Sequence, residues 1–600
     1  MSLSIMQMAI PNKPAYSDHL HKSHSSKSSK LSSSCKVSNA LRCSSQLNVD
    51  HLTTERRSGN YSPSRWDVDY IQSLQSDYKE KRHARRASEL IMQVKKMLEK
   101  KADPTPQLEL IDELQRLALS EHFHDEFKEI LSSVYLDNKY YKNGEIIEQE
   151  DGDLYSTALA FRLLRQYGFQ VAQEVFECFK NEEGEFKASL RDDTRGLLQL
   201  YEASFLSTEG ENTLDLAREF ATKILQEKLV NDEIDDSNLI TWTRHSLEIP
   251  IHWSIERVNT SVWIDAYKRR DDMNPIVLEL AILDSNIVQA LYQEELKQDL
   301  QWWRNTSLAE KLPFVRDRLV ESYFWGVGVV QPRQHGTARM VVDRSIAFIT
   351  VIDDVYDVYG TLEELEQFTD IIRRWDMSSM EQLPSYMQLC FLGLNNFIND
   401  TAYDVMKEQG INIIPYLRKS WRDLVEAYLV EAKWYHSGYK PNLKEYLDNA
   451  WITVGSTIVL THAFFGGTTS LTKETIQSFY GYHEIVRLSS MISRLADDLG
   501  TSMDEASRGD VPKSIQCYMN DNNASEAAAR EHVKWLIGET WKEMNKERVV
   551  RDSPFSQDFI KCALDMGRMA QYMYHYGDGH GIQHSIIHQQ MDAFLFHPSV

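Results

Sequence analysis

The chain contains little cysteine, proline or glycine for its 600 residues, with 6, 15 and 25 of each. None of the cysteines forms a C-x-x-C pair, so the sequence suggests neither a zinc site nor a disulfide-rich secreted domain. We expect reduced thiols in a non-oxidising compartment. Because glycine and proline interrupt helices, their scarcity favours a mostly helical chain with few turns.

Positive charge is outnumbered by negative charge, with 66 lysine and arginine residues against 89 aspartate and glutamate residues and a formal net charge of −23 at pH 7. Such an acidic chain is repelled by phosphate backbones, which disfavours nucleic acid as a partner. The sequence has no run of 18 apolar residues, so we expect no membrane-spanning segment. The apolar fraction of 42% is ample for hydrophobic cores. The length predicts two or more domains.

The first 55 residues differ in composition from the rest of the chain. Ser23–Ser45 is dense in serine and contains several lysines, and Asp18 is the only acidic residue up to Val49. This composition is typical of a plastid or mitochondrial transit peptide, whereas a secretory signal needs a basic start and a longer apolar stretch. A disordered tail without a targeting role is the alternative.

From Trp66 onward the sequence shows one amphipathic helical segment after another. Thr361 and Glu364 have the spacing of a capping box at the start of a helix. The polar stretch Arg269–Pro275 suggests a break between two halves. No strand-like alternation or fixed-period repeat is convincing.

The most distinctive segment, Val351–Gly360, has three carboxylates within five residues of an otherwise apolar stretch. On a helix Asp353 and Asp357 share a face, with Asp354 beside them. Gly360 predicts the end of that helix, where the macrodipole is negative. Mutually repelling carboxylates at this position destabilise the helix but suit hard divalent cations. A solvated acidic turn is the alternative, and the flanking apolar residues argue against it.

A second acidic cluster, formed by Asp497, Thr501 and Glu505, has the spacing of one helix face. Two carboxylates and a hydroxyl provide only oxygen donors, which suit Mg²⁺ or Mn²⁺ rather than zinc. Facing helices with the two clusters could hold metal ions that bind a phosphorylated ligand. Gly500 disfavours a helix, so a loop is the alternative conformation.

The chain has four motifs: Asp353-Asp354-x-x-Asp357, Asp497-Asp498-Leu499-x-Thr501-x-x-x-Glu505, Arg56-Arg57 followed after eight residues by Trp66, and Arg316-Asp317-Arg318. In these motifs the chain resembles the plant terpene synthases, most closely the monoterpene synthases of the limonene-synthase type found in mint-family plants. The order and spacing of the motifs match the family from about Arg56 to the C-terminus. The second motif has an aspartate where other members carry asparagine.

The resemblance implies an all-α fold of two helical domains, the C-terminal one a class I terpenoid synthase bundle. It divides the chain into a plastid transit peptide (1–55), an N-terminal helical domain (56–270) and a metal-binding catalytic domain (271–600). It implies a lyase that uses Mg²⁺ or Mn²⁺, with three ions per site, and acts on geranyl diphosphate in the plastid stroma. It is compatible with either a monomer or a homodimer. It implies no nucleic acid partner and no membrane partner.

The resemblance also implies roles for individual residues. The metal ligands would be Asp353, Asp354, Asp357, Asp497, Thr501 and Glu505. The substrate's diphosphate would be bound by Arg316, Arg494, Lys513, Arg56 and Arg57, with Asp353, Asp357 and Asp497 acting through the metal. For an arginine without a motif, a surface salt bridge is the ordinary interpretation. Arg318 also matches a family position.

Trp325 and Tyr574 match aromatic positions of the family's cavity and, with Arg316 and Arg494, complete the catalytic set. An ordinary core side chain is the alternative for each aromatic residue. His580 lies near the matching site for a terminal proton acceptor. Ile346 matches a cavity-wall position where limonene-type relatives often have a polar residue, which leaves the product open.

The tandem pair Arg56-Arg57 with Trp66 favours a cyclic product. In the family the pair closes over the active site and accompanies isomerisation of geranyl to linalyl diphosphate, which cyclisation requires because the trans double bond keeps the ends apart. The expected product is therefore a cyclic, limonene-type monoterpene. An acyclic or other monoterpene (myrcene, ocimene, linalool, pinene or terpineol) is the alternative, because acyclic-product members can retain the motif.

Other classes of function are less consistent with the motifs. A sesquiterpene synthase uses a longer substrate, and a chain-elongating prenyltransferase usually has two aspartate-rich motifs of the same form. A non-catalytic helical scaffold would leave both acidic clusters as solvated faces. A protonation-initiated cyclase is set aside because the chain has no Asp-x-Asp-Asp.

Overall fold

The computed structural model describes residues 56–99, 104–136, 153–332, 336–468, 471–507, 509–581 and 586–600. Within these ranges the regular structure is helical, and the one extended pairing is an isolated bridge between Lys180 and Phe186. The predicted all-α fold is confirmed. The predicted transit peptide, residues 1–55, lies outside the described ranges.

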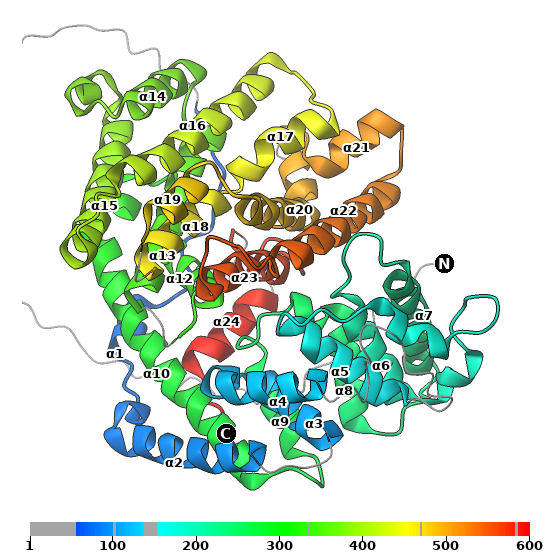
Figure 1. The fold of residues 1–600 in the computed structure, drawn as a ribbon. Helices are drawn as coiled ribbons and strands as arrows, with labels where there is room; N and C mark the ends of the chain where they lie inside the picture. The colour runs from blue at the N-terminus through cyan, green and yellow to red at the C-terminus, as the bar shows by residue number, and fades with distance from the viewer. Residues whose placement is uncertain are drawn as a thin grey trace, which may run out of the picture. The chain divides into compact units, whose positions relative to one another are not determined.

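The helices of the described residues can be followed in Figure 1. The first half contains α1 (Val68–Ser73), α2 (Lys81–Leu98), α3 (Pro104–Arg116), α4 (His124–Leu136), α5 (Leu154–Gln166), α6 (Thr194–Ser204), α7 (Asn212–Val230), α8 (Ser237–Glu248) and α9 (Thr260–Lys268). The second half contains α10 (Pro275–Thr306), α11 (Leu308–Lys311), α12 (Leu319–Val329), α13 (Gly336–Asp354), α14 (Leu362–Arg374), α15 (Ser385–Gln409), α16 (Ile414–Ser437), α17 (Leu443–Thr453), α18 (Ser456–Gly467), α19 (Lys473–Tyr480), α20 (Glu484–Ser507), α21 (Ser514–Asn522), α22 (Glu526–Glu547), α23 (Gln557–Met573) and α24 (Ile586–Phe596).

The long helix α10 belongs to two hydrophobic cores. It begins at Pro275, after Asn274 whose side chain accepts a hydrogen bond from the Ile276 amide, so the predicted break coincides with the loop before α10. Its first turns pack into the core of α2–α7, whereas its later turns pack into the core of the second half. The domain boundary at residue 270 remains a prediction, because α10 connects the two cores.

Helix α13 ends where the first acidic cluster lies. The α-helix stops at Asp354, and the next turn, Val355–Tyr359, is a π-helix that ends at Gly360. Thr361 and Glu364 then form the predicted capping box of α14. A π-turn has a wider repeat than an α-helix and often marks a functional site. Asp353 and Asp354 lie on the last turn of α13, whereas Asp357 lies in the π-turn.

Among the described residues, two helical segments are long and apolar enough to cross a membrane, although the sequence has no unbroken run of 18 apolar residues. They are Pro275–Thr306 and Leu443–Gly467, with mean hydropathies of 1.3 and 1.2. Within the protein, 50% and 72% of these windows are buried. Such burial is that of core helices in a large helical protein.

Candidate active site

A cavity of about 170 Å³ is surrounded by helices of the second half. Its lining includes most of the predicted site residues: Arg316, Trp325, Ile346, Asp353, Asp357, Arg494, Asp497, Thr501, Glu505, Lys513, Tyr574 and His580. Asp354, Arg56 and Arg57 do not line it. Asp353 and Asp497, 144 residues apart in the sequence, thus line one cavity, as the predicted pairing of the two acidic clusters requires.

The first acidic cluster is held by one arginine. The guanidinium of Arg316 forms ion pairs with Asp353 and with Asp354 Oδ1, the latter at 2.9 Å. The Arg316 amide also donates to Asp354 Oδ2 at 2.7 Å. Asp354 is fully buried behind the cavity, and this burial raises its pKa to about 6. Burial and the charge of Asp353 raise the pKa of Asp357 well above its usual value.

The second acidic cluster lies on α20, which continues as a helix through Gly500, so the loop alternative is wrong. The guanidinium of Arg494 forms ion pairs with Asp497 and, at 2.9 Å, with Asp498. Asp498 is buried and also accepts from the Tyr446 hydroxyl at 3.0 Å. Burial, only partly offset by Arg494, raises the pKa of Asp497 to about 7. The cavity-facing carboxyls of α20 are therefore crowded as well.

Lys513 links the two acidic clusters electrostatically. Its ammonium lies 3.6 Å from Glu431 Oε2 and 3.9 Å from Glu505 Oε2. Burial opposes its charge, but Glu505, Glu431 and Asp357 outweigh that effect and hold the pKa of Lys513 well above its usual value. Glu431, on α16, was not predicted from the sequence, because a single buried glutamate in a helix carries no motif.

The donor set fits divalent cations of the Mg²⁺ kind. Among the described residues, no three histidine, cysteine, aspartate or glutamate side chains converge on one point. Instead, each cluster contributes a few hard oxygen donors on one side of the cavity, and these carboxyls repel one another and are balanced by arginines. Mg²⁺ usually takes one or two protein carboxylates together with water and phosphate oxygens, so such dispersed donors suit it.

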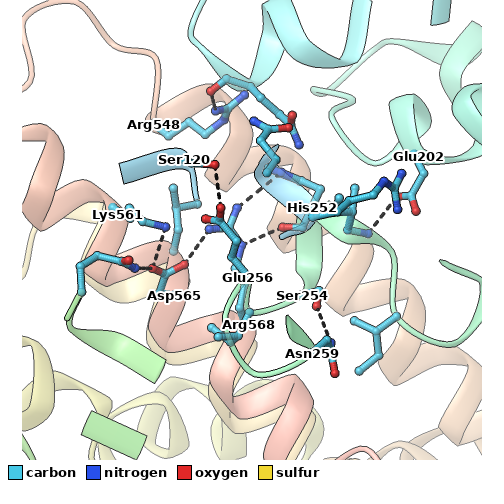
Figure 2. A pocket seen from close by; sticks show the side chains of 18 of the residues that line it. Ser120, Glu202, His252, Ser254, Glu256, Asn259, Arg548, Lys561, Asp565 and Arg568 are labelled. Carbon is cyan, nitrogen blue, oxygen red and sulfur yellow. Dashed lines mark hydrogen bonds and ion pairs between the residues drawn. The ribbon is translucent and has the colours of Figure 1, made fainter. Parts of the chain in front are cut away.

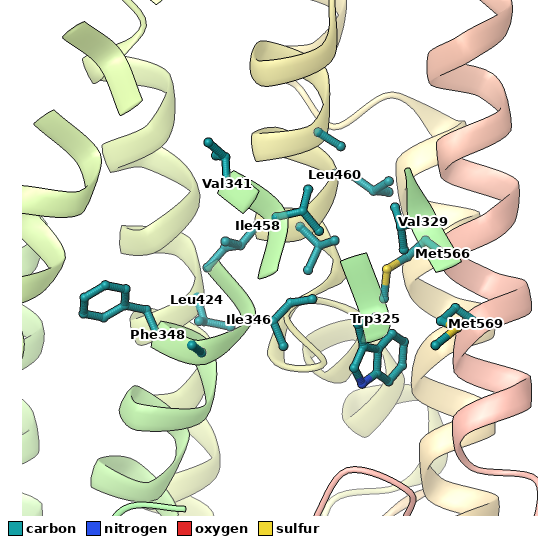
Figure 3. Packing of buried hydrophobic residues seen from close by; sticks show 14 of the residues in the cluster. Trp325, Val329, Val341, Ile346, Phe348, Leu424, Ile458, Leu460, Met566 and Met569 are labelled. Carbon is teal, nitrogen blue, oxygen red and sulfur yellow. The ribbon is translucent and has the colours of Figure 1, made fainter. Parts of the chain in front are cut away.

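Apolar and aromatic side chains form a further part of the cavity lining. The rings of Trp325 and Tyr574 lie 5.9 Å apart, and Figure 3 shows Trp325, Ile346 and Met566 among the apolar side chains packed between the helices. Ile346 and Met566 line the same cavity. The apolar and aromatic part of the lining can therefore enclose a hydrocarbon and exclude water.

His580 is partly buried beside this apolar wall rather than exposed in its glycine-rich turn. Its Nε2 lies 2.9 Å from the Thr350 hydroxyl. Burial and the nearby charges of Arg316 and Arg318 hold the pKa of His580 well below its usual value. The imidazole is therefore neutral at pH 7 and able to accept a proton.

The tandem arginines lie over the cavity-bearing helices and not in the cavity. Arg56 forms a two-pronged pair with Glu364 on α14, with both N–O distances at 2.8 Å. Arg57 donates to the Asp357 carbonyl at 2.7 Å and pairs with Asp510 at 2.8 Å. The pair thus connects the end of the first cluster to the loop before Lys513.

A larger cavity, of about 840 Å³, has a different character (Figure 2). None of the predicted site residues lines it. Its polar groups are largely paired with one another: Ser120 donates to Glu256 at 2.6 Å, and Asp565 pairs with Lys561 and Arg568 at 3.1 and 2.7 Å. We therefore regard the smaller cavity, where the acidic clusters meet an apolar wall, as the candidate active site.

Two carboxylate clusters of this all-α chain line one cavity together with apolar and aromatic side chains, and the chain has the fold of a class I terpenoid synthase. The metal-binding domain of the terpene synthase family matches residues 304–543, and the N-terminal domain of terpene synthases matches residues 65–247. The chain belongs to the terpene synthase family.

Individual relatives agree with this assignment. The chain is 54% identical to cineole synthase 1, chloroplastic, of Salvia fruticosa over 602 residues, which cover 100% of both proteins. A crystal structure of limonene synthase with 2-fluorolinalyl diphosphate is 66% identical, with a TM-score of 0.89 over 91% of this chain and 100% of that one. Isoprene synthase of grey poplar, in complex with three Mg²⁺ ions and dimethylallyl-S-thiolodiphosphate, is 40% identical, with a TM-score of 0.81 over 90% and 99%.

The close approach of α20 to the end of α23 gives a first testable prediction. A Cβ atom added at Gly500 would lie 2.8 Å from the Tyr574 carbonyl oxygen and 2.9 Å from its Cβ. Gly500→Ala is therefore expected to push Tyr574 away and change the product mixture while leaving metal dependence intact, as measured by gas chromatography. Gly538→Ala, whose added Cβ has only one side-chain atom within 4.0 Å, is the matched control. An unchanged product mixture in Gly500→Ala would contradict the prediction.

Proposed function

We propose that the chain is a cyclic monoterpene synthase that ionises geranyl diphosphate with the help of Mg²⁺ or Mn²⁺ and cyclises the resulting carbocation. One observation carries the proposal: acidic clusters on α13 and α20, interleaved with Arg316, Arg494 and Lys513, border an apolar aromatic cavity. A diphosphate and a short hydrocarbon chain need these two environments side by side. The likeness to a cineole synthase and a limonene synthase supports the same substrate class.

In this proposal the divalent ions neutralise the charge that develops on the diphosphate as its C–O bond breaks. The proposed ligands are Asp353, Asp354, Asp357, Asp497, Thr501 and Glu505. The isoprene synthase complex with three Mg²⁺ ions supports three ions for this chain as well. Both carboxylate oxygens of Asp354 contact Arg316, so this arginine has to shift before Asp354 can coordinate directly.

The basic side chains would bind the diphosphate. Arg316, Arg494 and Lys513 are each held between carboxylates, so bound cations can replace them there and free their N–H groups for phosphate oxygens. Arg56 and Arg57 are proposed to act from above the cavity, in the step that converts geranyl to linalyl diphosphate.

The aromatic end would guide the carbocation. The faces of Trp325 and Tyr574 stabilise positive charge without acting as nucleophiles. The neutral imidazole of His580 is a suitable base for the final proton. Ile346 adds an apolar surface to the wall, which favours loss of a proton over capture of water.

A cyclic, limonene-type product is the leading proposal, because the tandem arginines are tied to the cavity-bearing helices. An acyclic or other monoterpene is the second candidate, since the shape of the cavity decides the product. A plastid location after removal of residues 1–55 is proposed from the composition of this segment and from the chloroplastic relative.

The decisive experiment incubates the full chain with geranyl, neryl or farnesyl diphosphate and analyses trapped volatiles by chiral gas chromatography. We expect a cyclic C10 product from geranyl diphosphate with Mg²⁺, its loss with EDTA and its return when Mg²⁺ or Mn²⁺ is added back. If no substrate gives a metal-dependent volatile, the proposal is wrong. A longer prenyl diphosphate formed after addition of isopentenyl diphosphate would indicate a prenyltransferase.

A further inference from the structure

The segment Arg56–Trp66, here called the strap, is fixed at its N-terminal end by the tandem arginines. Arg56 is paired with Glu364, and its guanidinium also lies 4.6 and 5.2 Å from the ring centroids of Tyr359 and Tyr386. These contacts hold the first residues of the strap over the end of α13. The tandem arginines fix only this end of the strap, so a second fixed point is needed to hold its other end.

That second point is a buried cluster below Trp66. The indole Nε1 of Trp66 donates to Glu321 Oε1 at 2.9 Å, and His588 Nε2 lies 3.1 Å from the same oxygen. The rings of Trp66 and His588 are stacked with centroids 6.3 Å apart. Glu321 and His588 are both fully buried. A buried carboxyl oxygen that loses such partners carries a large desolvation cost, so this cluster is a strong anchor.

Tyr61 lies between the two fixed points and is the one strap residue in the lining of the candidate active site. Its ring lies 4.9 Å from the guanidinium carbon of Arg316. Arg318 donates to the Ser62 carbonyl at 3.0 Å and so holds the next residue. A Cβ atom at Gly59 would lie 2.4 Å from the Tyr61 ring, so any residue other than glycine at position 59 would displace the ring. The local sequence is therefore fitted to direct Tyr61 into the cavity.

We propose that Tyr61 is a wall residue of the reaction cavity that keeps water from the carbocation, and that the Trp66–Glu321–His588 cluster is the anchor that holds it there. The inference rests on the proposed cyclase function. When water enters, its oxygen bonds to the carbocation carbon and it loses one proton, which gives an alcohol. When water is excluded, the carbocation itself loses a proton and gives a hydrocarbon.

Tyr61 is tested by removing or keeping its ring. Tyr61→Ala is expected to raise the share of alcohols among the products by about threefold or more, because water fills the space that the ring leaves. Tyr61→Phe keeps the ring and should retain the wild-type share. Tyr70→Ala, at a 51% exposed tyrosine on α1, is the matched control and should change nothing. An unchanged alcohol share in Tyr61→Ala, with turnover still measurable, would overturn the assignment.

The anchor is tested at a distance from the cavity. Glu321→Leu removes the hydrogen-bond acceptor of Trp66 and should raise the alcohol share as Tyr61→Ala does. Glu321→Gln keeps an oxygen that accepts from Trp66 Nε1 and should restore the wild-type alcohol share. Glu202→Leu, at an equally buried glutamate of the first half, controls for general loss of stability. If Glu321→Leu does not fold, Trp66→Phe removes the indole donor, keeps a smaller aromatic ring and serves instead.

Three outcomes separate this inference from the proposed function. A wild-type chain without metal-dependent product would overturn the proposed function. A wild-type cyclase whose Glu321→Leu and Trp66→Phe variants keep the wild-type alcohol share would overturn the anchor alone. A Glu202→Leu variant that raised the alcohol share equally would show that lost stability, and not the strap, admits water.

Discussion

Asp353→Ala is expected to lower turnover of geranyl diphosphate by about three orders of magnitude, which corresponds to ~4 kcal/mol of transition-state stabilisation. Asp353 faces the cavity, and its side chain is partly exposed. Its carboxylate would bind the ions that neutralise the leaving diphosphate. Without it, Asp357 remains as the only carboxylate of this cluster that lines the cavity, and the charge on the leaving group is poorly balanced.

The fold should tolerate this change. The side chain of Asp353 is 28% exposed, and its loss relieves repulsion with Asp357 while Arg316 keeps its pair with Asp354. Thermal unfolding should therefore stay within a few degrees of wild type. Asp370→Ala, which removes an exposed carboxylate from α14, is the matched control and should retain activity. Activity of Asp353→Ala within tenfold of wild type would rule out the proposed metal role.

The local features of the site were predictable because they depend on spacing along one helix. Asp353 with Asp357 on α13 and the following π-turn, and Asp497 with Thr501 and Glu505 on α20, line one cavity as their intervals predict. Gly500 was the doubtful position, and the helix continues there because its missing side chain allows α20 to approach Tyr574. A residue that weakens an isolated helix is here required by packing.

The features that escaped prediction depend on contacts between distant segments. Asp354 belongs to the same motif as Asp353 and Asp357, yet its carboxylate contacts the backbone amide and the guanidinium of Arg316. Tyr61 lies more than 250 residues before the helices it faces, and Glu431 contacts Lys513 from another helix. Single residues of this kind have no periodicity or motif, so only the folded chain reveals them.

Arg494→Ala is expected to lower kcat/KM by about two to three orders of magnitude, because one strong charge-assisted contact to the diphosphate is lost. It should also destabilise the protein, by about 3 kcal/mol, since Asp497 and the buried Asp498 lose their shared cation. Arg494→Lys keeps the charge without the two-pronged geometry and should fall between these limits.

The two effects of Arg494 can be separated by a second substitution. Asp498 does not line the cavity and pairs with Arg494 from behind. In Arg494→Met/Asp498→Asn the uncompensated buried charge is removed, so thermal stability should largely recover while kcat/KM stays low. Arg487→Ala, on the same helix but paired with Glu484 near the surface, should leave both quantities unchanged. If kcat/KM recovered together with stability in the double variant, Arg494 would be a structural residue and its proposed contact with the diphosphate would be wrong.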